Sequence, residues 1–451
     1  MSLEITQQPR ETAALPRYFL YLKAGKIIKS VFTKHPLLAG ATFVLALIIL
    51  NRAGVKLQDV YKFGGKIIQL HRRINAMVVE FKTALTSEQL AWLEEHLHVD
   101  IEPVKEVRAY MDKAVVQSGV SIVQATTSFT GNGIKVAVVD TGINDNHPDL
   151  AGKVIARYDF SDKDYFGKSL WPWDWFKSTP KIPVAPKLDG VGHGSHCAGV
   201  IAGSGKTYKG VAPKVALIDA RVLNDSGHGS NDTVIKGMSW AADQGADIIS
   251  MSLGGEGTPD DAISREADAL ASEGIVVVVA AGNEGPRAKT IGSPSCAAKV
   301  ITVGSVDQEN KVTQYSSRGP VIYNGLDLTK PDLVAPGGGT MSAYGRCYYE
   351  NGITSVKSFD TKNNNCTVQA DGTSYQRMSG TSMACPHVAG ICALVLEAAP
   401  NWTKACPERC AAVKNLLKAT VKKLPYSANE CGVGLVDAKA AIDALKDKSN
   451  A

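Results

Sequence analysis

Residues 379–390, SGTSMACPHVAG, bring several nucleophilic groups together within a few positions. Ser379, Thr381, Ser382 and Cys385 each carry a hydroxyl or thiol that can attack a carbonyl carbon. A serine hydroxyl is a poor nucleophile unless a base removes its proton as it attacks. The chemistry of this stretch therefore depends on a base and on charge-stabilising groups that lie elsewhere in the chain.

Three residues far from this stretch could supply those groups. Asp140 ends the apolar run IKVAVVD, His193 lies in GHGSHCAG, and Asn283 follows the apolar run in VVAAGNEG. An imidazole, with an ordinary pKa near ~6.5, suits the role of proton acceptor, and a buried carboxylate can hold its tautomer. An asparagine amide and a backbone N–H at a helix start can stabilise the oxyanion that the attack produces.

Each of these residues has a plainer interpretation when it is taken alone. Asp140 could be a turn acid or a helix cap, Asn283 a turn residue beside glycines, and Ser382 an N-cap. His193 and His196 form an H-x-x-H pattern, which is only a weak indication of a zinc site. Together, in the order Asp, His, Asn, Ser, the residues indicate acyl transfer by a serine.

The candidate residues follow apolar runs that alternate with helical patterns such as DTVIKGMSWAADQG. The runs that we expect to be strands include residues 134–140, 216–223, 246–254 and 274–282. Near-continuous apolar strands joined by helical crossovers predict an α/β fold, with a mainly parallel sheet and helices on both faces. Functional groups collect at the carboxyl ends of such strands.

The four stretches DTGINDNHPDL, HGSHCAG, AAGNEG and SGTSMACPHVAG resemble the signature stretches of the subtilisin-like serine peptidases. They occur in the family's order, and the resemblance covers about residues 120–447. It implies a serine endopeptidase with Asp140, His193 and Ser382 as its catalytic triad and Asn283 in its oxyanion hole. It also implies a proenzyme that processes itself.

The resemblance further implies a set of substrate-binding residues. They are Asp189, Leu223, Asn224, Ser252, Leu253, Gly254 and Gly292. Asp189 would border the S2 subsite, and an extended peptide would pair with residues 252–254 on one edge and 223–224 on the other. A glycine at the floor of the S1 pocket leaves room for a large side chain. We therefore expect a preference for large apolar or aromatic P1 residues.

The same resemblance bears on metal ions and other partners. No cofactor is expected to be required, and calcium would serve as a structural ion. Asp149 matches a ligand of the family's strong calcium site, although the loop AGSGKTYKGVAP is short for that site, and Asp307 matches a weaker cation site. The expected partners are protein or peptide substrates and the chain's own propeptide, with no nucleic acid.

The N-terminal region differs from the rest in charge and hydropathy. Residues 1–73 hold 12 Lys or Arg against 3 Asp or Glu. We divide it into a basic segment at 1–35, a hydrophobic segment at 36–50 and a linker at 51–70. The hydrophobic segment predicts a signal-anchor or signal peptide, with the peptidase domain outside the cytoplasm. A buried core helix and an organelle transit sequence are the alternatives.

Residues 71–115 have the position and pattern of an inhibitory propeptide, before a peptidase domain at 116–451. NAMVVEFK alternates like a strand, TSEQLAWLEEHL begins with a capping box at Thr86 and Gln89, and HVDIEPVKEVRAYM again suggests extended chain. Processing is expected near residues 109–120. A permanent N-terminal subdomain is the alternative.

All nine cysteines lie after residue 196. Five of them occur in polar, loop-like stretches: Cys347, Cys366, Cys406, Cys410 and Cys431. Disulfides among these five are expected, with Cys347 and Cys366 able to close one loop, which would place this part of the chain in an oxidising compartment.

Two other functions compete with the serine peptidase. The first is a cysteine peptidase that uses Cys385. The second is an anchored, non-catalytic binding protein that keeps the fold, against which the complete set of four candidate residues argues.

Overall fold

The computed structural model describes residues 17–22, 62, 65–71, 76–81, 85–97, 99–103, 106–109, 117–161, 188–339, 352–361, 366–370 and 372–449. These residues belong to two compact units. The first comprises described residues up to Pro103, and the second comprises those from Glu106 onward.

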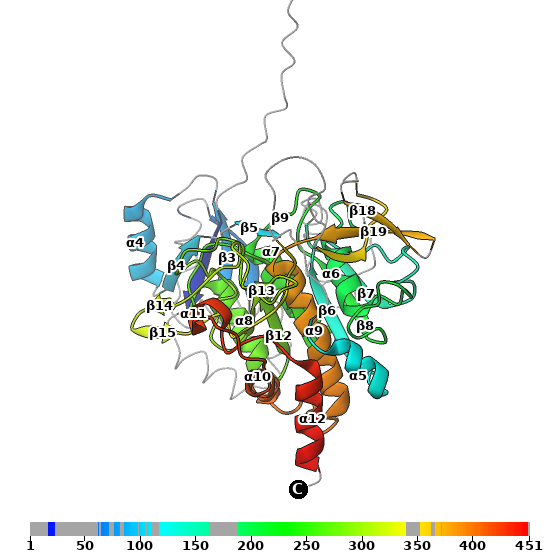
Figure 1. Cartoon of the computed structure of the whole chain (residues 1–451). Coiled ribbons are helices and arrows are strands. Elements are labelled where there is room, and N and C mark those ends of the chain that lie inside the picture. Colours follow the sequence, from blue (N-terminus) through cyan, green and yellow to red (C-terminus); the bar gives the residue numbers. More distant parts are fainter. Residues whose placement is uncertain are drawn as a thin grey trace, which may run out of the picture. The chain divides into compact units, whose positions relative to one another are not determined.

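A seven-stranded sheet forms the centre of the second unit (Figure 1). Its order is β16-β13-β12-β10-β6-β8-β7, and every pair of neighbours is parallel. The strands are β6 (Lys135–Asp140), β7 (Val154–Asp159), β8 (Ala216–Arg221), β10 (Ile248–Met251), β12 (Val276–Ala280), β13 (Ile301–Val306) and β16 (Leu333–Pro336). The predicted parallel α/β sheet is confirmed, because these apolar runs are buried on both faces.

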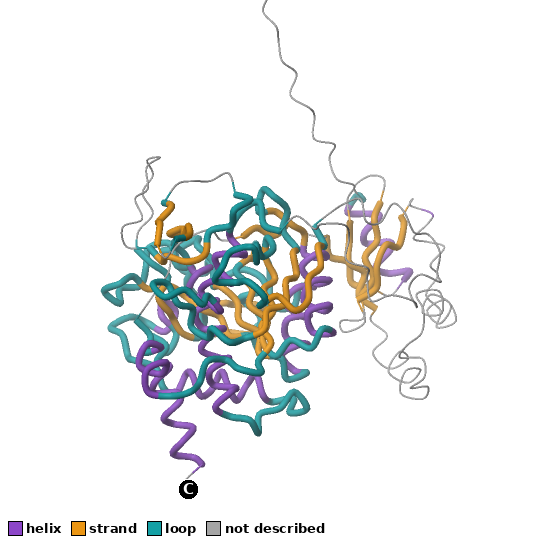
Figure 2. The backbone as a smooth tube through the Cα atoms, turned by 90° about the vertical axis from the view of Figure 1, so that its right-hand side faces the viewer, coloured by secondary structure: helices purple, strands orange, loops and turns teal. Residues whose placement is uncertain are grey.

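Helices cover both faces of this sheet, as the sequence predicts (Figure 2). Val136 and Val138 of β6 belong to the hydrophobic core on the side of α6 and α9, and Val139 faces α7 on the other side. The helices of this unit are α5 (Val120–Thr126), α6 (His193–Ala202), α7 (Asn231–Asp243), α8 (Ala262–Ser272), α9 (Thr381–Ala398), α10 (Arg409–Ala419), α11 (Ala428–Cys431) and α12 (Ala438–Ser449).

Smaller sheets surround the central one. The antiparallel strands β17 (Ile353–Val356), β19 (Thr373–Met378) and β18 (Thr367–Ala370) lie against α6, and β14 (Val321–Tyr323) pairs with β15 (Leu326–Leu328). His196 of α6 binds this first small sheet, because its Nε2 lies 3.2 Å from the Ile353 carbonyl and 3.0 Å from that of Gln376. The weak zinc indication at His196 therefore gives way to a packed histidine.

The first unit is a four-stranded antiparallel sheet of order β2-β3-β1-β4. Its elements are β1 (Arg17–Leu22), β2 (Gly65–His71), β3 (Ala76–Phe81), α4 (Ser87–Leu97) and β4 (Val99–Pro103). The expected strand–helix–strand order is present in β3, α4 and β4, and Thr86 and Gln89 form the capping box. Val79, Phe81 and Leu93 are fully buried.

The sheet of the first unit includes strands from outside residues 71–115. β1 comes from the segment assigned as basic, and β2 comes largely from the segment assigned as linker. β1 nevertheless lies in the interior of the sheet, between β3 and β4. A lone strand–helix–strand would leave most backbone groups of two strands unpaired, so the sheet recruits two further strands from earlier in the chain.

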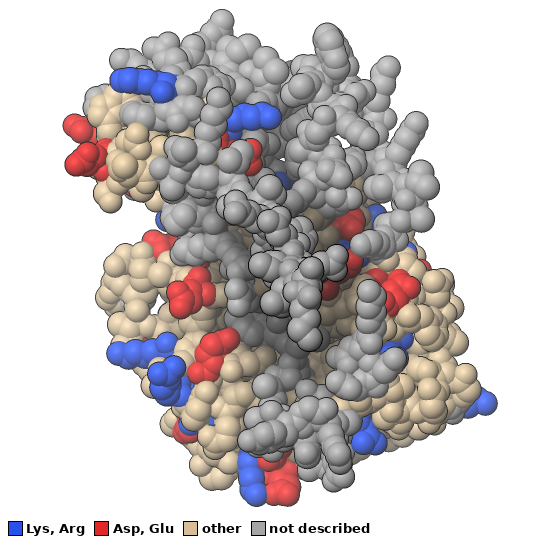
Figure 3. All heavy atoms as spheres, turned by 90° about the horizontal axis from the view of Figure 1, so that it is seen from above, with Lys and Arg blue, Asp and Glu red and all other residues tan. Residues whose placement is uncertain are grey.

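The hydrophobic segment 36–50 lies outside the described residues. Within the described residues, α9 is the one helix long and apolar enough to cross a membrane, and it is buried in the core. On the face shown in Figure 3, the described Lys and Arg side chains are interspersed with Asp and Glu and form no continuous basic patch.

The cysteines differ in part from expectation. Cys406, Cys410 and Cys431 are free thiols, and burial raises the pKa of the latter two. Cys366 is disulfide-bonded, whereas Cys347, the residue expected to pair with it, lies outside the described residues. The polar surroundings of the three free cysteines in sequence misled the prediction, because folding buries Cys410 and Cys431.

Candidate active site

Asp140 and His193 meet where β6 ends and α6 begins. His193 Nδ1 lies 2.7 Å from Asp140 Oδ1, and both side chains are buried. An ionised carboxylate can only accept, so Nδ1 carries the ring proton and Nε2 is the nitrogen that can take another. Gly194 must lack a side chain, because a Cβ there would lie 2.2 Å from the Gly142 carbonyl oxygen.

Asp189 anchors the start of α6. Its Oδ1 accepts hydrogen bonds from the Gly192 N–H at 2.8 Å and the Thr141 hydroxyl at 2.9 Å. Its Oδ2 accepts from the N–H of Ser195 at 2.9 Å and from its hydroxyl at 2.6 Å. Burial raises the pKa of Asp189 to about 6, although these donors favour the ionised form.

Thr141 connects Asp189 to Asp140. Its backbone N–H donates to Asp140 Oδ1 at 2.7 Å, and its hydroxyl oxygen accepts from the Gly194 N–H at 2.9 Å. Asp189 is fully buried. Its carboxylate binds Thr141 and the start of α6, which hold Asp140 and His193 in place, and its expected position beside the S2 subsite stays a prediction.

Ser382 lies in the first turn of α9. The helix follows Gly380, whose φ of 148° favours glycine and which has no side chain to cap the helix. The Ser382 hydroxyl lies 3.4 Å from the Ser252 carbonyl, and its backbone N–H has no acceptor among the described residues. That N–H and the positive end of the helix dipole are available to an oxyanion.

Asn283 is oriented by the residue before the serine. Its Oδ1 accepts from the Thr381 N–H at 3.1 Å and from the Thr381 hydroxyl at 3.0 Å. A backbone N–H can only donate, so the amide oxygen must face Thr381 and the amide N–H groups face elsewhere. Asn283 can therefore donate a hydrogen bond to an oxyanion at Ser382.

Pro386 frees the backbone carbonyl of Ser382. A residue at this helical position would normally donate its N–H to the carbonyl four residues earlier, and proline has none. The Ser382 carbonyl instead accepts from the Ser252 hydroxyl at 2.7 Å and from the Cys197 thiol, on α6, at 3.4 Å. The carbonyl thus joins the nucleophile's helix to a neighbouring strand end and to the helix of His193.

The other candidate nucleophiles have structural roles. The Ser379 hydroxyl donates to the Gly339 carbonyl, and Thr381 is committed to Asn283. Cys385 is fully buried, with its sulfur 3.4 Å from the Val278 carbonyl, and burial raises the pKa of its thiol to about 12. A thiol with that pKa supplies almost no thiolate, so the cysteine-peptidase alternative is rejected.

Comparison with known proteins decides the family. A model described as the subtilase family matches residues 131–434. Serine protease AprX of Bacillus subtilis is 37% identical over 363 residues, which cover 75% of this chain and 73% of AprX. Thermitase of Thermoactinomyces vulgaris is 35% identical over 275 residues, 60% of this chain and 78% of thermitase. Subtilisin E of B. subtilis is 31% identical over 391 residues, 84% and 83% of the two chains.

This chain belongs to the subtilase family. Its relatives are named as serine proteases and subtilisins, and it is a subtilisin-like serine endopeptidase. The alternative of a non-catalytic binding protein is set aside.

A strand of the chain itself lies between the two edges of the subtilase cleft. β5 (Glu106–Ala109) pairs antiparallel with β11 (Leu253–Gly254) on one side and with β9 (His228–Ser230) on the other. Ala109 lies opposite Leu253, and Arg108 lies between Gly254 and His228. A peptide backbone therefore fits here as the middle strand of a three-stranded sheet.

The strand that pairs with the other side of β5 is β9. The expected contact of Leu223 and Asn224 with substrate stays a prediction. Leu223 is fully buried. Asn224 forms the turn before β9, since its Oδ1 accepts from the N–H groups of Ser226 and His228. The glycine in SGHGS, an extended stretch after a strand, was the one sequence signal that could have identified this edge.

Gly292 is required for a close backbone approach. A Cβ at Gly292 would lie 2.1 Å from the Gly255 carbonyl oxygen. Gly255 and Ser293 exchange backbone hydrogen bonds of 3.0 and 2.9 Å. The absence of a side chain at Gly292 therefore lets this loop pair with the strand edge. The sequence analysis explained the glycine only by the room that it leaves at the floor of the S1 pocket.

The two aspartates proposed as calcium ligands have other partners. Asp149 accepts a hydrogen bond from the Tyr375 hydroxyl at 3.0 Å, and Asp307 Oδ1 closes a turn with the N–H groups of Glu309 and Lys311. Neither belongs to a group of three His, Cys, Asp or Glu residues within the described parts of the chain. The one such group there is Asp140, His193 and Cys197.

Proposed function

We propose that this subtilase is made as a proenzyme that cleaves its own chain shortly after β5. The pairing of β5 with both cleft edges supports the proposal, because an extended segment between those edges occupies the place of a substrate's acyl side. The residues before β5 would then form the inhibitory propeptide. Its sheet includes β1 and β2 as well as β3 and β4.

Catalysis follows from the arrangement of the named groups. His193 Nε2 takes the hydroxyl proton of Ser382 as the oxygen attacks the peptide carbonyl carbon, and Asp140 stabilises the imidazolium. The carbonyl oxygen becomes an oxyanion, which the Asn283 amide and the Ser382 N–H bind. The C–N bond breaks as His193 returns the proton to the amine, and water then hydrolyses the acyl-enzyme by the same route.

The register of β5 points to one bond. Residues 110–116 lie outside the described residues. Ala109, the last described residue of β5, lies opposite Leu253, one residue before the register would reach Ser252. Ser252 is the residue whose carbonyl neighbours the Ser382 hydroxyl. Cleavage between Tyr110 and Met111 follows, with an aromatic P1 residue that agrees with the expected preference.

Processing of the wild type and of Ser382→Ala tests the proposal. The wild type should yield a mature form whose first residue is Met111, and Ser382→Ala should remain full length. A serine-directed fluorophosphonate should label the wild type and Cys385→Ala but not Ser382→Ala. Labelling of Ser382→Ala would refute the assigned nucleophile, whereas a different mature N-terminus would refute only the register.

We further propose that the folded proenzyme is not anchored in a membrane through residues 36–50, which lie outside the described residues. β1 precedes this segment and β2 follows it, and both pair with β3 in one sheet. A single crossing would place β1 and β2 on opposite sides. The membrane anchor expected from the sequence is the alternative. Full-length Ser382→Ala should be released from membranes by alkaline carbonate, and its retention there would contradict the assignment.

Two smaller expectations remain proposals. Cys366 pairs with Cys347, which non-reducing peptide mapping tests. Catalysis needs no cofactor, so a chelator should leave the initial rate unchanged. Calcium at Asp149 or Asp307 would act on stability alone, as a chelator-dependent fall in Tm.

A further inference from the structure

A buried lysine, Lys330, is connected through hydrogen bonds to the end of β12, the strand that precedes Asn283. Lys330 is 2% exposed, and its ammonium is bound to Asp332 Oδ2 at 2.8 Å, to the Thr302 hydroxyl oxygen at 2.8 Å and to the Val300 carbonyl at 3.1 Å. All three of its N–H groups are therefore used. Burial lowers the pKa of Lys330 to about 8, with Asp332 opposing the shift, so it is charged at neutral pH.

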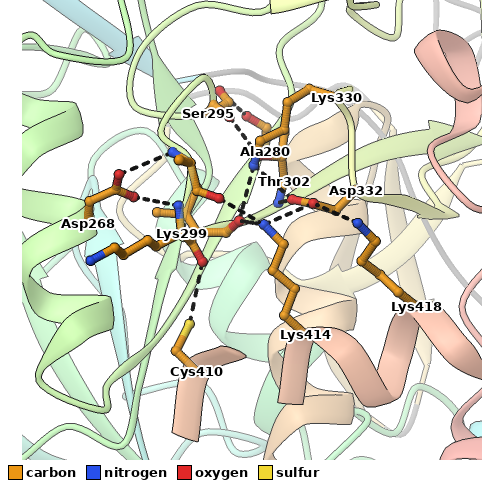
Figure 4. A network of polar contacts seen from close by, with 12 residues as sticks. Asp268, Ala280, Ser295, Lys299, Thr302, Lys330, Asp332, Cys410, Lys414 and Lys418 are labelled. Atoms are coloured by element: carbon orange, nitrogen blue, oxygen red, sulfur yellow. Dashed lines mark hydrogen bonds and ion pairs between the residues drawn. The ribbon is translucent and has the colours of Figure 1, made fainter. Parts of the chain in front are cut away.

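The lysine starts a directional chain of hydrogen bonds (Figure 4). Because the Thr302 oxygen accepts from Lys330, its hydroxyl proton is directed to the Ser295 carbonyl, at 2.6 Å. The Ser295 hydroxyl in turn donates to the Ala280 carbonyl at 2.8 Å. Thr302 and Ser295 are fully buried, so water does not compete for these bonds.

Asp332 holds the charged end of the chain in place. Lys414 lies 2.9 Å and Lys418 3.6 Å from its Oδ1, while the Thr302 N–H donates to Oδ2 at 2.9 Å. Burial alone would raise the pKa of Asp332, but Lys330 and Lys414 lower it to about 2. The carboxylate is thus ionised throughout the working pH range of a protease and keeps Lys330 oriented.

The far end of the chain is close to the oxyanion donor. Ala280 ends β12, and Asn283 follows three residues later. The intervening turn is held by α9 on one side, where the Gly282 N–H donates to the Thr381 hydroxyl oxygen at 3.2 Å. It is held by β13 on the other, where the Ala281 N–H donates to Val303 at 2.9 Å. Ser295 adds a third restraint at the strand end.

We propose that Lys330, Thr302 and Ser295 are positioning residues that act through Asn283, by fixing the strand end from which its amide reaches the oxyanion. The proposal rests on the proposed role of Asn283 in the oxyanion hole. A displacement of about 1 Å in a catalytic group can cost ~10²-fold in rate. The loss of one restraint among several should cost less, about 10-fold.

Double-mutant kinetics on the mature enzyme test this. Variants that process slowly are matured by a trace of tagged wild type, which is then removed, and active sites are titrated. Ser295→Ala and Thr302→Val should each lower kcat about 10-fold with KM unchanged, and Asn283→Ala should lower it about 10²-fold or more. Adding Ser295→Ala to Asn283→Ala should then cost nothing further. Lys330→Met is a stronger variant whose folding is checked by Tm.

The outcomes distinguish the positioning role of Lys330, Thr302 and Ser295 from the oxyanion role of Asn283. Lys418→Met is the matched control, because this lysine reaches Asp332 but not the chain, and its kcat should stay within about 2-fold of wild type. If Ser295→Ala lowers kcat equally with and without Asn283, or leaves it unchanged in the wild type, the positioning role is refuted. If Asn283→Ala itself leaves kcat within about 3-fold, the oxyanion role is wrong instead.

Discussion

The helices α6 and α9 each carry a proposed catalytic residue in the first turn, yet these first turns differ in their hydrogen bonds. The N-terminal N–H groups of α6 are occupied, because Asp189 binds those of Gly192 and Ser195 and Thr141 binds that of Gly194. In the first turn of α9 the Asn283 side chain binds the Thr381 N–H, but the Ser382 N–H has no acceptor among the described residues. Free N–H groups at a helix start normally reduce its stability.

The difference matches what each helix must do. His193 has to be held at one angle to Asp140 so that its proton stays on Nδ1, and a saturated helix start provides that rigidity. Ser382 needs donors that are unused until charge develops on the substrate oxygen. A Ser382 N–H without an acceptor among the described residues is thus a stability cost retained for catalysis, and the rigidity of this helix start comes from tertiary contacts to the Ser382 carbonyl and to Thr381.

Removing the anchor of α6 should have the largest effect among the changes considered below. Asp189→Asn keeps the shape but places an amide N–H against groups that all donate, so kcat/KM should fall about 10²-fold. Since it also removes a buried negative charge, the acid limb of the pH–kcat/KM profile should shift to lower pH. Asp225→Asn, at a more exposed carboxylate, is the control. A fall in Tm without any change in kcat/KM would make Asp189 purely structural.

Removing the contact to the carbonyl of α9 should have a smaller effect. Ser252→Ala deletes the hydroxyl bonded to the Ser382 carbonyl and leaves the Ser252 backbone in place. The carbonyl then keeps only the weaker thiol contact of Cys197, and kcat should fall about 10-fold. Steady-state kinetics with a chromogenic peptide would measure this. An unchanged kcat would show that the carbonyl needs no partner beyond Cys197.

Each helix also carries a buried histidine outside the proposed triad that should limit stability in acid. Burial lowers the pKa of His387, in α9, to about 4 and that of His196, in α6, to about 3. The unfolded chain binds these protons near pH ~6.5, so stability is full above that pH and is lost as pH falls towards 4.

Melting of the mature enzyme, inactivated at Ser382, checks this between pH 7 and 4. The wild-type Tm should fall steadily over this interval. His387→Gln should melt lower at pH 7, where the bond from Ser118 is lost, but should lose less Tm on acidification. Parallel Tm–pH curves for the two proteins would show that His387 does not titrate on unfolding.

Cys385→Ser should have the smallest effect on activity. The thiol lies one helical turn after Ser382, but it faces the core and the Val278 carbonyl. The hydroxyl can donate to the same carbonyl, so kcat should remain within about 2-fold. A loss of more than 10-fold in titrated enzyme would reopen a role for the thiol in catalysis.

The sequence by itself predicted the four candidate catalytic residues and determined the sheet that carries them. Asp140, His193, Asn283 and Ser382 follow apolar runs or begin helices, and those local patterns follow from backbone periodicity and burial. The capping box at Thr86 and Gln89 is likewise a local pairing, which the structure contains. Features of this kind depend on residues a few positions apart.

Only the tertiary structure determined which groups far apart in the chain form hydrogen bonds with one another. Asp189 anchors the start of α6 because donors from Thr141, Gly192 and Ser195 meet it inside the protein. The second cleft edge lies in β9 because a turn at Asn224 brings that strand against β5. The interior position of β1 likewise depends on pairing between strands far apart in the chain. Hydrogen bonds between distant segments form only when folding removes the competing water, and no spacing in the sequence records them.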